Sequence, residues 1–257
     1  MKPWTRRADE VQAASGRFLT SATVADYAPN IAAFIAAKCG IIVTVGSLMA
    51  DATEAAARAH PRQRFAIMDC SYRSRCLTGK RVRNIDRLTF STVQDGFLGG
   101  YLAAGQSKTH VVATYGGRHI GTVTIYMDGF WDGVQYYDRK HHADVKVLGW
   151  NERTQKGDFI GNFTDLTGGC VSATPYCRHF LTSVTKGIAR AARAAVLAAA
   201  SGAFRMTYTG ILANGGVALA PYHGFARKIP ATLQAEITTL RSQIESGRIV
   251  PATKSPV

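Results

Sequence analysis

The 257-residue sequence lacks the short motifs by which many enzymes are identified. It has no GxxxxGK[ST] phosphate loop, no GxSxG nucleophile turn, no HExxH zinc motif and no GxGxxG after a predicted strand. Gly99 and Gly100 fall within a predicted helix and are interpreted as packing residues. His141 and His142 are adjacent and would point to different sides of a helix, so they form a poor metal pair. The sequence therefore predicts no enzyme, no cofactor, and no catalytic or metal-binding residue.

Long apolar segments are also absent. The alanine-rich stretch 187–200 is interrupted by Arg190 and Arg193 and is too short to span a bilayer. The amino-terminal sequence MKPWTRRADEVQAASG has basic residues but no apolar segment after them, so no signal peptide is recognisable. As written, the chain is expected in the cytoplasm, or it is incomplete at its amino end.

Acidic residues are few relative to basic ones. The sequence has 17 Asp and Glu against 31 Lys and Arg, which gives a net charge of +14 and a pI near 9.9. Such a balance favours contact with nucleic acid, anionic lipid or anionic solutes. The basic residues are nevertheless scattered, and the densest cluster, residues 73–87, lacks the interleaved aromatic residues of a single-strand binding groove. We therefore expect no nucleic-acid partner.

Cysteine is scarce, with residues at positions 39, 70, 76, 170 and 177. Cys70 with Cys76, and Cys170 with Cys177, would each close a short loop, as is common in exported proteins. Neither spacing is typical of a zinc site. The alternative is five free thiols, with Cys39 buried at the end of a helix, and the sequence leaves both interpretations open.

What the sequence does contain is a complete βαβ unit at residues 39–69. Residues 41–45 form a β-branched run that predicts a strand buried on both faces. Residues 49–60 are rich in Ala, Glu and Arg and predict a helix, which the following proline ends. Residues 65–68 predict the next buried strand.

Asp69 directly follows this second strand. The carboxyl ends of strands in open α/β sheets are where ligand-contacting groups lie. Asp69 is therefore either a ligand-contacting residue or the cap of a turn, and its position alone does not decide between them.

Strands alternate with helices along most of the remaining chain. Helices are predicted within 23–38 and at 94–106, 124–141, 185–200 and 231–246, and strands at 88–93, 111–115, 145–149 and 180–184. A last pair of strands, 208–212 and 217–219, is expected to turn at Asn214, Gly215 and Gly216. This alternation predicts an α/β fold with mostly parallel sheets.

Two places in the sequence look incomplete for such a fold. No convincing strand precedes the first helix, although a parallel sheet needs one there. Residues 161–177 contain no predicted helix, where one or two further βα units are expected. We interpret both as lost segments.

Several phrases, taken together and in order, carry a resemblance to a known family. They are ADYAPNIAAFIAAKCGIIVTVGSLMADAT, RFAIMDCSY, LTFSTVQDGFLGGYLAAGQSKT, TVTIYMDGFWDGVQYY, LGWNERTQKGDFIGNFTD, YCRHFLTSVTKGI and GILANGGVALAPYHGF. The chain resembles the basic membrane protein family, the extracytoplasmic solute-binding components of ABC transporters that include purine nucleoside receptors.

The resemblance implies an incomplete type I periplasmic-binding-protein-like fold, in which two α/β lobes close on a ligand. The first lobe is expected to comprise residues 1–107 and 184–204, without its first strand. The second lobe is expected to comprise residues 108–183 and 205–257, with an internal deletion near 165–169.

The resemblance also implies ligand-binding residues. Asp69 takes the position of an aspartate that recognises the base in nucleoside-binding relatives, and a carboxylate can accept hydrogen bonds from purine N–H groups. Lys186, in LTSVTK, takes the position of a lysine that contacts ribose oxygens. Without the resemblance, Lys186 would be a solvated lysine in the first turn of a helix. Gly46, Ser47 and Met49 are expected to line the same cleft.

The function implied is that of the solute-binding component of an ABC uptake transporter, which captures a purine nucleoside between its lobes. Its partners would be a permease and an ATPase, and the fully folded chain would be a monomer. Relatives are lipoproteins on the extracytoplasmic face of the cell membrane, whereas no lipobox is present in this sequence.

Two other interpretations stay open. The first is a non-binding remnant, because loss of a central strand would expose backbone groups, and two polar contacts of about 1–3 kcal/mol each cannot replace a closed cleft. The second is a small α/β enzyme or nucleic-acid binder on the same scaffold, which would show turnover or strongly salt-dependent association.

Overall fold

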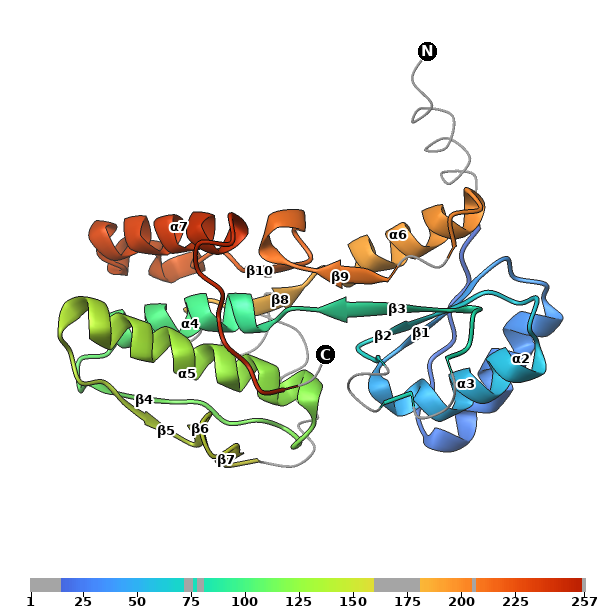
Figure 1. The fold of residues 1–257 in the computed structure, drawn as a ribbon, viewed down its shortest axis with the longest axis horizontal. Helices are drawn as coiled ribbons and strands as arrows, with labels where there is room; N and C mark the ends of the chain where they lie inside the picture. Colours follow the sequence, from blue (N-terminus) through green and yellow to red (C-terminus); the bar gives the residue numbers. More distant parts are fainter. Residues whose placement is uncertain (1–14, 72–75, 78–80, 160–180, 205–206, 256–257) are drawn as a thin grey trace, which may run out of the picture. The chain divides into compact units, whose positions relative to one another are not determined.

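The computed structural model describes residues 15–71, 76–77, 81–159, 181–204 and 207–255, which belong to two compact units (Figure 1). The first unit extends to Phe90 and includes Ile188–Gly210, and the second comprises Ser91–Gly187 and Ile211–Pro256. The backbone therefore passes from one unit to the other at 90–91, 187–188 and 210–211. The expected deletion near 165–169 lies outside the described residues, as does the segment 161–177.

The first unit is built on a four-stranded parallel sheet of order β1-β2-β3-β9. Its strands are Ile42–Val45, Phe65–Met68, Ile85–Phe90 and Tyr208–Gly210. One face carries α2 (Tyr27–Ala36), which follows the short turn η1 (Val24–Asp26), and α3 (Ala50–Ala59); the other carries α6 (Ile188–Ala200) (Figure 1). The predicted βαβ unit and the α/β class are confirmed.

Strand β2 lies at the centre of the first unit's core. Its four residues are at most 1% exposed, because helices cover both faces and β1 and β3 flank it. Burying four apolar side chains at about 1.5–3 kcal/mol for each large one supplies much of the drive for folding this unit. The continuous apolar run seen in the sequence is the pattern that a strand covered on both faces requires.

The second unit is built on two long helices, α4 (Val93–Gln106) and α5 (Gly121–His141), which pack closely. Glycines make the close approach possible: a Cβ atom on Gly100 would lie 2.0 Å from the Phe130 carbonyl oxygen, and one on Gly133 would lie 2.0 Å from that of Phe97. Gly100 is thus a packing residue, as predicted, and its contact is with α5. Within the described part of the chain, no helix combines the length and apolar character needed to cross a bilayer.

Short strands and a carboxyl-terminal helix complete the second unit. The strand pairs are β4 (Val111–Ala113) with β5 (Lys146–Leu148), β6 (Trp150–Asn151) with β7 (Lys156–Gly157), and β8 (Val184–Lys186) with β10 (Val217–Leu219). The remaining elements are η4 (Leu212–Asn214), η5 (His223–Lys228) and α7 (Ala231–Glu245). The first of these strand pairs is parallel and the other two are antiparallel.

A buried carboxylate on α5 binds the carboxyl-terminal segment through hydrogen bonds. Asp128 is fully buried and accepts hydrogen bonds from the Trp150 indole N–H at 3.0 Å and the Gln155 side-chain amide at 2.8 Å. Its second oxygen accepts the hydroxyls of Thr253 and Ser255 at 2.7 and 2.8 Å. One side chain therefore holds β6, the adjoining turn and the carboxyl-terminal segment together.

Two strand predictions in the last third of the sequence were wrong. The strands 208–212 and 217–219 do not pair with each other: β9 joins β3 in the first unit, and β10 joins β8 in the second. Gly215, at φ +66°, follows η4, so the Asn-Gly-Gly sequence ends a helical turn and does not form a hairpin. The strand expected at 180–184 lies at Val184–Lys186, and the following helix begins at Ile188.

The two units divide the chain earlier than the expected lobes do. Helix α4 was expected in the first lobe, which was to extend to residue 107, whereas the structure groups it with the second unit from Ser91. The glycine contacts between α4 and α5 explain this grouping, because they bring the two helix backbones together along several turns.

Candidate functional site

The predicted ligand residues of the first unit gather at the carboxyl ends of β1 and β2. Gly46 follows β1 and donates its N–H to the Met68 carbonyl at 3.3 Å, and Asp69 follows Met68. Gly46 has φ +102°, a conformation that residues with a Cβ atom rarely adopt. The sequence placed these residues at neighbouring strand ends, and the parallel pairing of β1 with β2 brings them together.

Asp69 itself has an unusual backbone. Its φ is +60°, in the left-handed region, which Asp and Asn tolerate better than other non-glycine residues. The Asp69 N–H donates to the Leu88 carbonyl at 2.9 Å, which anchors the residue to β3, and its side chain is partly exposed. The fold therefore imposes a strained conformation on a partly buried acidic residue at a strand end, a combination typical of functional positions.

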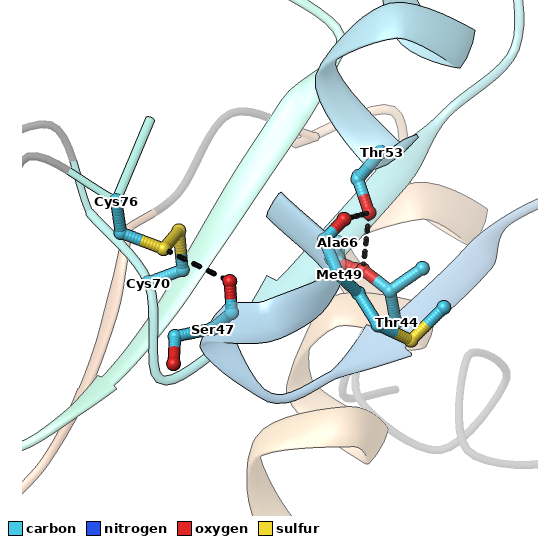
Figure 2. The surroundings of a disulfide bond; sticks show 7 residues. All are labelled: Thr44, Ser47, Met49, Thr53, Ala66, Cys70 and Cys76. Atoms are coloured by element: carbon cyan, nitrogen blue, oxygen red, sulfur yellow. Dashed lines mark hydrogen bonds between the residues drawn. A yellow bond between two sulfur atoms is a disulfide. The ribbon is translucent and has the colours of Figure 1, made fainter. Parts of the chain in front are cut away.

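A buried hydroxyl pair supports the turn after β1 (Figure 2). This turn is η2 (Ser47–Met49), which leads into α3. The Thr53 hydroxyl lies 2.8 Å from the Met49 carbonyl and 2.9 Å from the Thr44 hydroxyl, which in turn lies 3.3 Å from the Ala66 carbonyl. Thr44 and Thr53 are almost fully buried, so they fix the turn relative to the strands.

A disulfide joins Cys70 to Cys76 beside this turn (Figure 2). The Cys76 sulfur lies 3.6 Å from the Ser47 carbonyl oxygen. An oxidised sulfur has no hydrogen to donate, so this is a packing contact that places Cys76 against the turn after β1. Of the two pairings considered from the sequence, this one is formed; Cys170 and Cys177 lie outside the described residues, and Cys39 is a free thiol.

Lys186 belongs to the second unit, where it is the last residue of β8. It pairs with Val217 of β10, and its Nζ lies 5.3 Å from the centre of the Tyr126 ring on α5. A cation over an aromatic ring at this distance is held by the ring's quadrupole. Lys186 is therefore half-buried in a strand and not, as its position in the sequence suggested, in the first turn of a helix.

A buried carboxyl group lies near Lys186. Asp95, in the first turn of α4, is fully buried; its Oδ1 accepts the Gly96 N–H at 3.1 Å, and its Oδ2 has no hydrogen-bond partner within the described part of the chain. Burial raises the pKa of Asp95 to about 8, against the opposite effects of nearby backbone N–H groups and of the Lys186 charge. This carboxyl group is thus a proton-carrying neighbour of the predicted ribose-binding lysine.

Replacing Asp95 by Asn should remove a pH dependence of stability. The folded-state pKa lies near 8 and the ordinary value is 3.8, so between these pH values the folded state keeps a proton that the unfolded state has lost, and the free energy of unfolding falls as pH rises. We expect Asp95→Asn to be more stable than the original chain at about pH 8, by about 1–3 kcal/mol, with a smaller difference near pH 5. Urea titrations at several pH values measure this, and parallel pH profiles for both proteins would contradict it.

Two neighbours of Lys186, Asp95 and Tyr126, were not predicted from the sequence. Asp95 carried a usable signal, because it lies among the glycine and apolar residues of the segment QDGFLGGYL, where a charged side chain is unusual. Tyr126 carried none, since its contact with Lys186 joins residues far apart in the sequence. Among the residues with described positions, no group of three or more His, Cys, Asp or Glu could hold a metal ion.

The chain is similar in sequence to known substrate-binding proteins of ABC transporters. The family model described as "ABC transporter substrate-binding protein PnrA-like" matches residues 7–159. The ABC transporter nucleoside-binding protein BmpA of Lactococcus lactis subsp. cremoris is 22% identical over 160 residues, which is 62% of this chain and 44% of that protein. Basic membrane protein A of Borreliella burgdorferi is 30% identical over 134 residues, 52% of this chain and 35% of that protein. The matches thus span less than half the length of these relatives.

Solved structures agree with the fold. A solute-binding protein of an ABC transporter system from Conexibacter woesei has a TM-score of 0.70 and 17% identity, over 97% of this chain and 92% of that one. Another from Aeropyrum pernix has a TM-score of 0.69 and 20% identity, over 96% and 87%. The α/β fold of this chain is therefore that of ABC solute-binding proteins. With more than half of its length matched by the family model, the chain belongs to the PnrA-like family of ABC transporter substrate-binding proteins.

Proposed function

We propose that this chain captures a purine nucleoside for an ABC uptake transporter, with Asp69 as a base-recognition residue and Lys186 as a ribose contact. The match to the PnrA-like family model carries the proposal. Two further facts support it: a relative that it resembles bears the name nucleoside-binding protein, and Asp69 occupies a strained position at a strand end. Gly46, Ser47 and Met49 would line the site beside Asp69.

The proposed setting is the extracytoplasmic face of the cell membrane, with a permease and an ATPase as partners. The disulfide between Cys70 and Cys76 supports this setting, because such bonds persist in oxidising compartments and are rare in the cytosol. It lies beside the proposed site, because Cys70 directly follows Asp69.

A thermal melt with nucleosides tests the proposal. Adenosine, guanosine and inosine are added separately at millimolar concentration to the purified chain, with ribose and free bases as controls. A ligand at about 100 times its dissociation constant raises the free energy of unfolding by about 2.7 kcal/mol, which a melt resolves easily. A cooperative transition that no nucleoside raises would overturn the proposal in favour of a chain that folds without binding, and a broad transition would favour the remnant.

Removing one charge from the site should weaken binding without unfolding the chain. Asp69→Asn keeps the side chain's shape and its tolerance of the left-handed conformation, but removes the anionic acceptor. We expect affinity for the best nucleoside to fall about 10- to 100-fold, the effect of losing a charged hydrogen bond, in titration calorimetry. Lys186→Met should produce a similar loss.

The controls are exposed charges outside the proposed site. Asp144→Asn removes an exposed carboxylate just before β5, and Lys146→Met removes an exposed lysine from β5. Neither should change affinity by more than about twofold, since surface charges far from a site act weakly. Equal losses in a site variant and its control would show that net charge, and not the assigned contact, governs binding.

A further inference from the structure

Five arginines surround one hollow in the first unit. The hollow has a volume of about 740 Å³ and is lined by Arg58, Arg62, Arg64, Arg81 and Arg83. They come from the end of α3, the connection into β2 and the connection into β3. The sequence had singled out residues 73–87 as its densest basic cluster without finding a role for it.

One side chain ties these three segments together. The Asn84 amide nitrogen lies 3.0 Å from the Ala57 carbonyl, 3.1 Å from that of His60 and 2.8 Å from that of Gln63. The Asn84 amide therefore donates hydrogen bonds to carbonyls at and just after the carboxyl end of α3, and it links them to the start of β3. The arginines that line the hollow thus come from segments that the Asn84 side chain joins by hydrogen bonds.

The positive charge of the hollow is largely uncompensated. Arg58 pairs with Glu54 one turn earlier on α3. Within the described ranges, Arg62, Arg64, Arg81 and Arg83 form no ion pair with a carboxylate, and all four are exposed. Like charges held around one hollow repel each other, and this repulsion is relieved when an anion of several charges binds among them.

The chemistry of the lining points to phosphate groups. Guanidinium groups bind phosphate through two parallel hydrogen bonds, and a hollow of this size falls within the range of small-molecule sites. Val82 and the half-buried Phe204 line the same hollow and offer apolar surface for the organic part of a ligand. We infer that this hollow binds a nucleoside diphosphate or triphosphate, with the four uncompensated arginines on its phosphates.

This site is separate from the one proposed for nucleosides. Arg64 directly precedes β2 and Asp69 directly follows it, so the two residues lie at opposite ends of the strand, about 16 Å apart along it. The inference does not depend on nucleoside capture, and each site can fail its test while the other passes.

Titration calorimetry with ATP, ADP and inorganic tripolyphosphate tests the inference on the whole chain. The test variant is Arg81→Gln with Arg83→Gln; the control, Arg227→Gln with Arg248→Gln, removes the same charge from exposed positions of the second unit. We expect ATP affinity to fall at least about tenfold in the test variant and to change less than about twofold in the control. Raising the salt from about 50 to about 300 mM should weaken binding in the original chain.

Three outcomes would overturn the inference. The first is equal weakening in both double variants, which would mean that net charge alone attracts ATP. The second is loss of ATP binding in Asp69→Asn, which would place the nucleotide at the nucleoside site. The third is Arg81- and Arg83-dependent binding of anionic vesicles or duplex DNA without binding of soluble phosphates. A thermal melt of each variant confirms that it is folded before its titration is interpreted.

Discussion

Replacing Gly100 by Ala is expected to destabilise the second unit by at least about 3 kcal/mol, at the upper end of the cost of overpacking. The added Cβ atom would lie 2.0 Å from the Phe130 carbonyl oxygen and 2.7 Å from its carbon. These are backbone atoms in the middle of α5, so no side-chain rotation can relieve the overlap. The helices would have to separate, and the buried contacts around Phe97 and Val134 would loosen with them.

Gly99 provides a matched control on the next residue of the same helix. A Cβ atom there would meet the Val184 side chain at 3.6 Å, which is an ordinary contact. Because alanine is the better helix former, Gly99→Ala should leave stability unchanged or raise it by up to about 1 kcal/mol. Urea denaturation of both variants measures the difference. Similar stabilities would show that α4 and α5 are not in contact through Gly100.

The elements that the sequence predicted well are those that local pattern determines. The apolar run of β2 and the alanine-rich α3 follow from burial and helix propensity, which neighbouring residues express directly. The pairing of strands that lie far apart in the sequence leaves no comparable local pattern. Strand β9 joins β3 and β10 joins β8, and the Asn-Gly-Gly turn signal between β9 and β10 suggested a local hairpin instead.

The same distinction between local pattern and tertiary contacts applies to the residues of the candidate site. Gly46 and Asp69 could be placed at neighbouring strand ends because the βαβ unit predicts parallel strands whose carboxyl ends meet. The left-handed backbone of Asp69 could not, since it accompanies a hydrogen bond to Leu88, which belongs to a strand later in the sequence. Lys186 was identified by resemblance, but its strand, and the nearby Tyr126, depend on tertiary packing.

Removing the charge of Asp128 is expected to release the carboxyl-terminal segment. Asp128→Asn keeps the volume, but its amide nitrogen would replace either the oxygen that accepts the Trp150 indole N–H or the oxygen that accepts the Thr253 hydroxyl, and it would face donors in both positions. Leaving such buried donors unpaired should lower the free energy of unfolding by about 3–5 kcal/mol. Hydrogen exchange gives a local measurement, because the amides of Lys254 and Ser255 also donate to Asp128.

Asp132, one turn later on α5, provides the control. It distinguishes the effect of the buried Asp128 carboxylate from a general effect of acidic residues on the helix. Its Oδ2 accepts the Ala252 N–H at 3.0 Å near the surface, where water can replace the lost acceptor. Asp132→Asn should therefore cost less than about 1 kcal/mol and leave exchange at Lys254 and Ser255 slow. Fast exchange in Asp128→Asn alone means that the buried carboxylate holds the end of the chain. Unchanged exchange in both variants would mean that apolar packing holds the carboxyl-terminal segment in place. The hydrogen bonds to Asp128 would then form as a result of that packing and would not be needed for it.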